Sequence, residues 1–190
     1  VIGGHPVRFT IRDQVEQVAP HAKVIIEPCR RDTMAAVLLA AISAAAEDPG
    51  TVLAVMPSDH MIKEDADFRT AIVTAAGHVA KTGIAVIGVV PKQPSTAYGY
   101  IKPGDDLGGG AFKVARFVEK PDKATATNLI AQRCLWNAGI FCFRAGWLIE
   151  AMTALYPDAV AAMRRSVAAM QPDLGMFVPG ADFNDVVSIS

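Results

Sequence analysis

Apolar and polar positions divide the first half of the chain into short apolar runs and longer stretches with helical spacing. The runs AKVIIEP, TVLAVMP and IAVIGVVP are rich in β-branched residues and end in proline, which predicts strands. Between them, apolar residues recur every three to four positions, which predicts helices. The predicted strands cover residues 22–28, 51–57 and 84–91, and the predicted helices cover residues 35–46 and 65–81. Thr33 is expected to cap the first of these helices.

The order of these elements predicts the fold class. Strands that alternate with helices form parallel sheets with right-handed crossovers, and continuous apolar strands suit a sheet covered on both faces. In the second half, YGYIKPG and FKVARFVEKP flank the glycine-rich DDLGGG and predict a hairpin. The remaining predicted elements are helices at 122–132, 145–155 and 157–170 and a strand at 134–143. We therefore expect an α/β protein with a Rossmann-like mixed, mostly parallel sheet and helices on both faces.

Composition narrows the class of protein. The 190 residues suit a single domain, and the 52% apolar content is ample for a core. With 18 basic and 19 acidic residues, nothing favours nucleic acid or an anionic membrane as a partner. The longest nearly apolar run, residues 34–46, is too short to span a bilayer. Three cysteines without metal or redox spacing predict reduced thiols in a cytoplasmic protein.

Polar side chains follow the ends of several predicted strands. Glu27 ends the first strand and is followed by the segment 30–33, whereas Asp59 follows the second strand. Glu119 and Lys120 end a later strand. Ligands of open parallel sheets bind outside the carboxyl ends of the strands, so we expect these groups to converge on one crevice.

Each candidate also has a purely structural interpretation. Asp59 could cap a helix, and Arg31 with its neighbours could be a solvated basic patch rather than an anion cradle. Glu119 and Lys120 could form an exposed ion pair of little energetic value. Asn137 is harder to explain structurally, because an amide within an apolar strand needs a hydrogen-bonding partner.

Glycines give mixed evidence. Gly99 lies between two tyrosines in a predicted strand, where a glycine allows close approach of a ligand. The run at 108–110 lacks both nucleotide-binding glycine spacings and predicts a turn. An NAD-binding fold therefore has little support.

Five segments together resemble the mannose-1-phosphate guanylyltransferase family of sugar nucleotidyltransferases. They occur in the family's order and are EPCRRDTMAA (27–36), MPSDHMI (56–62), PSTAYGYI (94–101), VARFVEKP (114–121) and LWNAGIFCF (135–143). Members of this family transfer GMP from GTP to mannose 1-phosphate, which gives GDP-mannose and pyrophosphate. The resemblance implies a fold of the nucleotide-diphospho-sugar transferase type.

The resemblance also implies roles for individual residues. Catalytic roles fall to Asp59, which would hold Mg²⁺, and to Lys120, which would lie near the phosphate of the sugar. Arg31 and Thr33 would face the nucleotide. The sugar phosphate would contact Gly99, Glu119, Lys120 and Asn137.

Departures from the family pattern leave alternatives open. Asp32 stands where the family has asparagine, and Ala138 stands where it has serine. The family's glycine-rich signature and its second metal-binding aspartate are not seen, so we expect a partial domain, truncated at both ends and inactive by itself. The alternatives are a related sugar-1-phosphate nucleotidyltransferase with another base or sugar, and a non-catalytic nucleotide-sugar-binding module. A homo-oligomer is left open.

Overall fold

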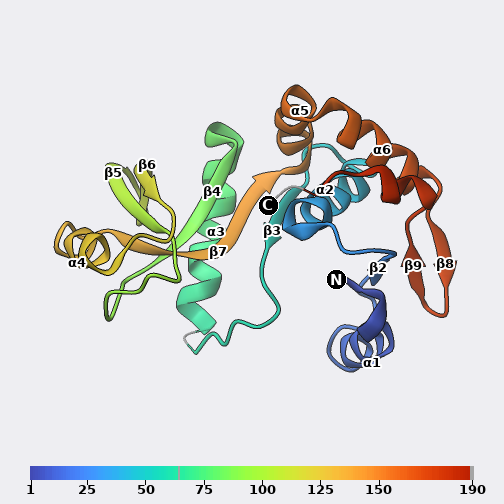
Figure 1. The fold of residues 1–190 in the computed structure, drawn as a ribbon, viewed down its shortest axis with the longest axis horizontal. Coiled ribbons are helices and arrows are strands. Elements are labelled where there is room, and N and C mark those ends of the chain that lie inside the picture. Colours follow the sequence, from blue (N-terminus) through green and yellow to red (C-terminus); the bar gives the residue numbers. More distant parts are fainter. Residues whose placement is uncertain (64, 189–190) are drawn as a thin grey trace. The chain divides into compact units, whose positions relative to one another are not determined.

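The computed structural model describes residues 1–63 and 65–188. By their internal contacts these residues form two compact units, each taken by itself below. The first unit comprises Val1–Thr51 together with the described residues from Ala145 onward, and the second is Val52–Arg144. Figure 1 shows the elements of both units along the chain.

The first unit contains a four-stranded sheet in the order β1-β2-β9-β8. Its strands are β1 (Ile2–Gly4), β2 (Ile25–Glu27), β8 (Gln171–Asp173) and β9 (Met176–Val178). The β1–β2 and β2–β9 pairs are parallel, whereas β8 and β9 form an antiparallel hairpin. Ile26 and Met176 are buried beneath α1 (Arg8–Val18), which contributes apolar side chains to the same cluster.

Three helices pack against one another in the first unit, namely α2 (Asp32–Ala45), α5 (Ala145–Leu155) and α6 (Pro157–Ala168). Helix α2 buries Leu38, Leu39 and Ile42, which recur at the spacing of one helical face. The unit also contains two short 3₁₀ helices, η1 (His5–Val7) and η2 (Ala181–Asp185). Phe183 of η2 is fully buried and fixes this segment against α6.

The second unit is built around the long strand β7 (Leu135–Arg144), drawn in orange in Figure 1. β7 pairs antiparallel with β3 (Val52–Val55), β4 (Ile84–Val89) and β5 (Tyr100–Gly108). β5 continues into a hairpin with β6 (Ala111–Val118). Helix α3 (Asp65–Thr82) packs on β4 and β7, and helix α4 (Lys123–Ala131) packs on β5.

The mixed α/β class predicted from the sequence is confirmed. The predicted elements are all present, although the first strand and the helix ends shift by a few residues. The three cysteines are free, as expected. None of the helices described is both long and apolar enough to cross a bilayer.

The strand pairing differs from the expected parallel arrangement. β2 lies in the sheet of the first unit, whereas β3 and β4 flank β7 in the second. Cys142 of β7 pairs with Ala54 on one side and Ala85 on the other, so β3 and β4 are each antiparallel to the strand between them. The reason is that β7 is as apolar as β3 and β4, so it can occupy the buried centre of a sheet. Hydrophobicity alone did not reveal this order.

Candidate functional site

Asp59 lies in the turn that follows β3. Helix α3 begins only at Asp65, so Asp59 does not occupy the capping position of that helix. Its Oδ1 is 4.0 Å from Nε2 of His60, and its side chain is 86% exposed. An exposed carboxylate at a strand end can accept a ligand without losing a structural role.

A cavity of about 590 Å³ opens beside Asp59 in the second unit. Its polar lining residues are Asp59, His60 and Asp67, and its other lining residues are apolar or glycine and come from the segment after β3, from α3, from β4 and from β7. Ala138 of β7 is one of these wall residues, at the position where the family resemblance expects a serine. Volume and lining suit a small ligand that has both polar and apolar parts.

Gly99 lies directly against the Glu119 side chain. A methyl group on Gly99 would come within 2.7 Å of Glu119 Oε2 and within 2.7 Å of Phe117 Cζ. Gly99 is buried just before β5 begins, and its position leaves no space for a side chain. Gly99 therefore lies close to the side chain of Glu119, which follows β6, and the predicted approach of a ligand to this glycine stays a prediction.

Lys120 has a strained backbone. Its φ is 41°, a left-handed conformation that non-glycine residues adopt rarely. Its Nζ is 3.6 Å from Oε1 of Glu119, and both side chains are largely exposed. The chain is then fixed by Asp122, which accepts a 2.7 Å bond from the Thr125 amide as the cap of α4, and this bond lowers the pKa of Asp122. The strained Lys120 thus lies between β6 and α4, and its side-chain amine is exposed to solvent.

Asn137 connects β7 to Gly99. The backbone N–H of Asn137 donates to the Gly99 carbonyl at 2.8 Å, and its side-chain Oδ1 accepts from the Gly139 N–H at 3.0 Å. Gly139 has a φ of 67°, so a side-chain bond stabilises a left-handed turn within β7. The bonds seen among the described residues engage the oxygen of the Asn137 amide and leave its NH₂ group as a donor for a ligand.

Arg31 and Thr33 lie in the first unit, at the start of α2. Arg31 is the residue before the helix, and its Nη2 donates to the Asn184 carbonyl. Asp32 has a φ of 53°, and its carboxylate accepts a bond from Ser188 Oγ. The segment 184–188 therefore holds the first residues of this helix from a distant part of the chain.

The predicted capping role of Thr33 is wrong. α2 begins at Asp32, so Thr33 lies within its first turn, and among the described residues no side chain caps the helix start. The helix starts at the left-handed Asp32, three residues before the predicted start at residue 35. Thr33 is exposed there and available to a ligand.

Glu27 is a candidate that sequence reasoning noticed but assigned no role. Its Oε1 is buried and has no hydrogen-bond partner in the described part of the chain, and Nε of Arg31 is in the same situation. Burial raises the pKa of Glu27. The sequence feature that could have indicated a role for Glu27 is its position as a charged residue at the end of an apolar strand. Two unpaired polar atoms close to one strand end fit a ligand that offers both a donor and an acceptor.

The structure thus joins part of the predicted set directly. Gly99 touches Glu119 and bonds to Asn137, and Lys120 pairs with Glu119, whereas Asp59 shares its cavity with the neighbour of Asn137. Arg31 and Thr33 belong to the other unit. Within the described ranges, no group of three or more His, Cys, Asp or Glu side chains could hold a metal ion. A single carboxylate with substrate phosphates suffices for Mg²⁺, and the exposed Asp59 fits that requirement.

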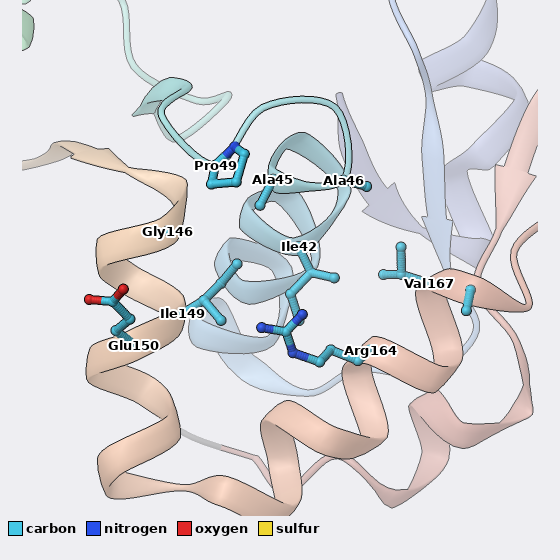
Figure 2. A pocket seen from close by; sticks show the side chains of 10 residues that line it. Ile42, Ala45, Ala46, Pro49, Gly146, Ile149, Glu150, Arg164 and Val167 are labelled. Atoms are coloured by element: carbon cyan, nitrogen blue, oxygen red, sulfur yellow. The ribbon is translucent and has the colours of Figure 1, made fainter.

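A further hollow of about 410 Å³ lies in the first unit among α2, α5 and α6. Figure 2 shows mainly apolar walls, with Ile42 and Ile149 facing inward and the Arg164 side chain extending between the helices. None of the predicted site residues lines it. It is therefore separate from the candidates above.

Comparison with known proteins gives a consistent picture. The sequence model of the nucleotidyl transferase family matches residues 4–189. The mannose-1-phosphate guanylyltransferase of Escherichia coli K12 is 35% identical over 182 residues, which cover 92% of this chain and 38% of that protein. The xanthan biosynthesis protein XanB of Xanthomonas campestris is 37% identical over 169 residues, covering 87% of this chain and 36% of its own. The chain thus spans little more than a third of the length of these relatives.

Two solved structures share the fold. A Helicobacter pylori protein described as mannose-6-phosphate isomerase superposes with a TM-score of 0.81 at 22% identity, covering 100% of this chain and 74% of its own. A Thermus thermophilus protein described as mannose-1-phosphate geranyltransferase has a TM-score of 0.74 at 25% identity, covering 95% of this chain and 58% of its own. At this level of identity the first of them supports the fold alone.

Proposed function

Because the chain belongs to the nucleotidyl transferase family, we propose that it forms part of an enzyme that transfers GMP from GTP to mannose 1-phosphate. The observation that carries this proposal is a chain of pairwise contacts, in which Gly99 lies against Glu119 and bonds to the backbone of Asn137, and Glu119 pairs with Lys120. These residues supply a carboxylate, an amine and an amide. Hydroxyl and phosphate groups of a sugar phosphate need such partners. The names of the most similar relatives favour mannose as the sugar.

The reaction is a phosphoryl-type transfer. A phosphate oxygen of mannose 1-phosphate attacks the α-phosphorus of GTP, and the bond from that phosphorus to the bridging oxygen breaks. Pyrophosphate leaves with the bonding electron pair, and GDP-mannose remains. Catalysis of such a step consists mainly of positioning and charge neutralisation, so no protein nucleophile is needed.

The residues of the second unit would divide these tasks. The amine of Lys120 would neutralise the sugar phosphate, while Glu119 and the NH₂ group of Asn137 would accept from and donate to sugar hydroxyls. Asp59 would hold Mg²⁺, which supplies Lewis-acid stabilisation of the transferring phosphate and a template for the triphosphate. The apolar wall at Ala138 would exclude water from one side of this cavity.

The first unit would read the nucleotide. Guanine presents an N2 amino donor and an O6 acceptor, which match the unpaired Glu27 oxygen and Arg31 nitrogen. Thr33 and the exposed amides of the first turn of α2 would meet a phosphate or ribose oxygen.

The test is pyrophosphorolysis by the protein at its natural full length. We expect GTP to form from GDP-mannose, pyrophosphate and Mg²⁺, with little product from UDP-glucose or GDP-glucose. Asp59→Ala should lower this rate by about 10²-fold or more, as loss of a metal carboxylate or other preorganised charge does.

Other outcomes would change the assignment. Preferential use of UDP-glucose would indicate the related transferase with another base and sugar. A folded protein that binds GDP-mannose without turnover would be a nucleotide-sugar-binding module. An unaffected Asp59→Ala variant would leave the transferase intact and remove Asp59 from the metal site.

A further inference from the structure

Tyr100 is a fully buried residue whose hydroxyl makes two hydrogen bonds with the backbone of one other residue. The Ser95 amide donates to Tyr100 Oη at 2.9 Å, and Oη donates to the Ser95 carbonyl at 3.0 Å. Tyr100 is 0% exposed and packs with Ala126, Leu129 and Cys134. A core side chain therefore closes a surface loop upon itself.

The loop that is closed in this way comprises residues 95–100. Its middle residues are exposed, and its start is stabilised further by a 3.2 Å bond from the Ala97 amide to Ser95 Oγ. Tyr98 in this loop is 48% exposed and pairs with the Trp136 ring at a centroid distance of 5.0 Å. With both ends held, the path of the chain through Tyr98 and Gly99 is restricted.

The end of this loop is also the point where the proposed sugar site is joined. The Gly99 carbonyl accepts the Asn137 amide, and Gly99 has no free space on the side of Glu119. Displacement of the loop would therefore move a backbone acceptor and the surface against which Glu119 rests. A displacement of about 1 Å at a binding site can lower the rate by about 10²-fold.

We propose that Tyr100 is a positioning residue for the sugar-phosphate side of the site, acting through its hydroxyl on the loop 95–99. It touches no substrate in this scheme. It holds Gly99 and Tyr98 so that Glu119 and Asn137 keep their places. This inference rests on the proposed function, because it names what the loop positions.

The experiment is Tyr100→Phe in the full-length protein, which removes the hydroxyl and keeps the ring in the core. Hydrogen exchange at the Ser95 amide should become faster, because that amide loses its acceptor. The KM for mannose 1-phosphate should rise about tenfold, which is the effect of about two ordinary hydrogen bonds. The KM for GTP should stay within about twofold, since the nucleotide side lies in the other unit.

Tyr156→Phe is the matched control. Tyr156 joins α5 to α6 in the first unit, is 41% exposed and lies outside the proposed machinery. The control should leave Ser95 exchange and both KM values unchanged. Ser95→Pro is a second variant, which removes both the amide donor to Tyr100 Oη and the Oγ acceptor of the Ala97 amide and leaves the Tyr100 side chain unchanged.

The outcomes separate this inference from the proposed function. A wild-type protein without guanylyltransferase activity would end the proposed function, while Ser95 exchange would still report on the hydroxyl. With an active wild type, an unchanged KM for mannose 1-phosphate in either variant that folds would overturn the positioning role. An equal rise in both KM values would do the same, because it would indicate general loss of structure.

Discussion

The candidate residues of the two units are held in place by different means. In the second unit, Gly99, Glu119 and Asn137 come from the ends and bends of strands that pair with one another, so the register of one sheet fixes them. In the first unit, Arg31 and Asp32 precede or begin a helix and are held by Asn184 and Ser188. Sheet register brings the first set together, whereas the second depends on a distant chain segment.

This difference separates two kinds of sensitivity. Strands in a packed sheet are held rigidly, so the displacement of one residue also displaces the residues packed against it. The start of a helix that is held by two hydrogen bonds can shift when either bond breaks, and each bond lost costs only the free energy of about one ordinary hydrogen bond. We therefore expect substitutions in the second unit to have large effects on the sugar side, and those in the first unit to have smaller effects on the nucleotide side.

Among the substitutions that test this comparison, the largest effect is expected for Gly99→Ala. The added methyl would come within 2.7 Å of the Glu119 carboxylate and the Phe117 ring, which must move. Because both are ends of side chains, the fold should tolerate the change. The displaced carboxylate should lower kcat/KM for mannose 1-phosphate by about 10²-fold, measured by initial rates at saturating GTP.

Gly77→Ala is the control for this substitution. Gly77 lies in α3, and a methyl there meets nothing within 4 Å among the described residues. Alanine in a helix interior should raise the free energy of unfolding by about 1 kcal/mol and leave the rate unchanged. If Gly99→Ala kept full activity while folded, Glu119 would have no part in sugar binding.

Sequence analysis found the sheet-held group because each member lies in a short motif with a chemical signal. Asn137 was an amide in an apolar strand, and Glu119 and Lys120 ended another. The sequence predicted the hairpin but not that Gly99 contacts Glu119, since this contact depends on the register of β5 and β6, in which Tyr100 pairs with Val118. The pairing order could not be predicted because β3, β4 and β7 are similarly apolar.

The helix-held group was harder to predict. The segment 27–33 was recognised, but its contacts with Asn184 and Ser188 cross more than 150 positions of the chain. Neither contact is marked by a local sequence pattern, and nothing in the sequence around Ser188 indicates that its hydroxyl donates to Asp32. The left-handed Asp32 was also invisible, although aspartate is one of the residues that tolerate this conformation.

An intermediate effect is expected for Ser188→Ala, in the first unit. It removes the bond to Asp32 and loosens the start of α2, where Arg31 and Thr33 would face the nucleotide. The KM for GTP should rise about fivefold, the effect of about one hydrogen bond. The KM for mannose 1-phosphate should not change, and the ratio of the two effects is the measurement.

Asp32→Asn is the matched control, because asparagine keeps an oxygen acceptor for Ser188 and tolerates a positive φ. It should change the KM for GTP by less than about twofold, as a retained acceptor implies. A larger rise than that of Ser188→Ala would show that the charge of Asp32, and not its bond, matters at this helix start.

The smallest effect is expected for Glu27→Gln, measured as stability against pH. Burial raises the pKa of Glu27 in the folded protein above its unfolded value. The folded state therefore binds the proton more tightly, and the contribution of Glu27 to stability is fully present below the unfolded pKa. It is lost as pH rises through the raised, folded pKa.

Glutamine at position 27 cannot ionise, so the variant should match the wild type in acid. Near neutral pH the variant should melt at a higher temperature than the wild type, because it does not carry the ionised carboxylate that burial penalises. The same variant should use GTP less well, because the ionised carboxylate proposed to bind guanine accepts stronger hydrogen bonds than the neutral amide oxygen that replaces it. A variant less stable than the wild type at neutral pH would instead mean that the ionised carboxylate has a stabilising partner in the protein, and guanine recognition would have to be sought elsewhere in the first unit.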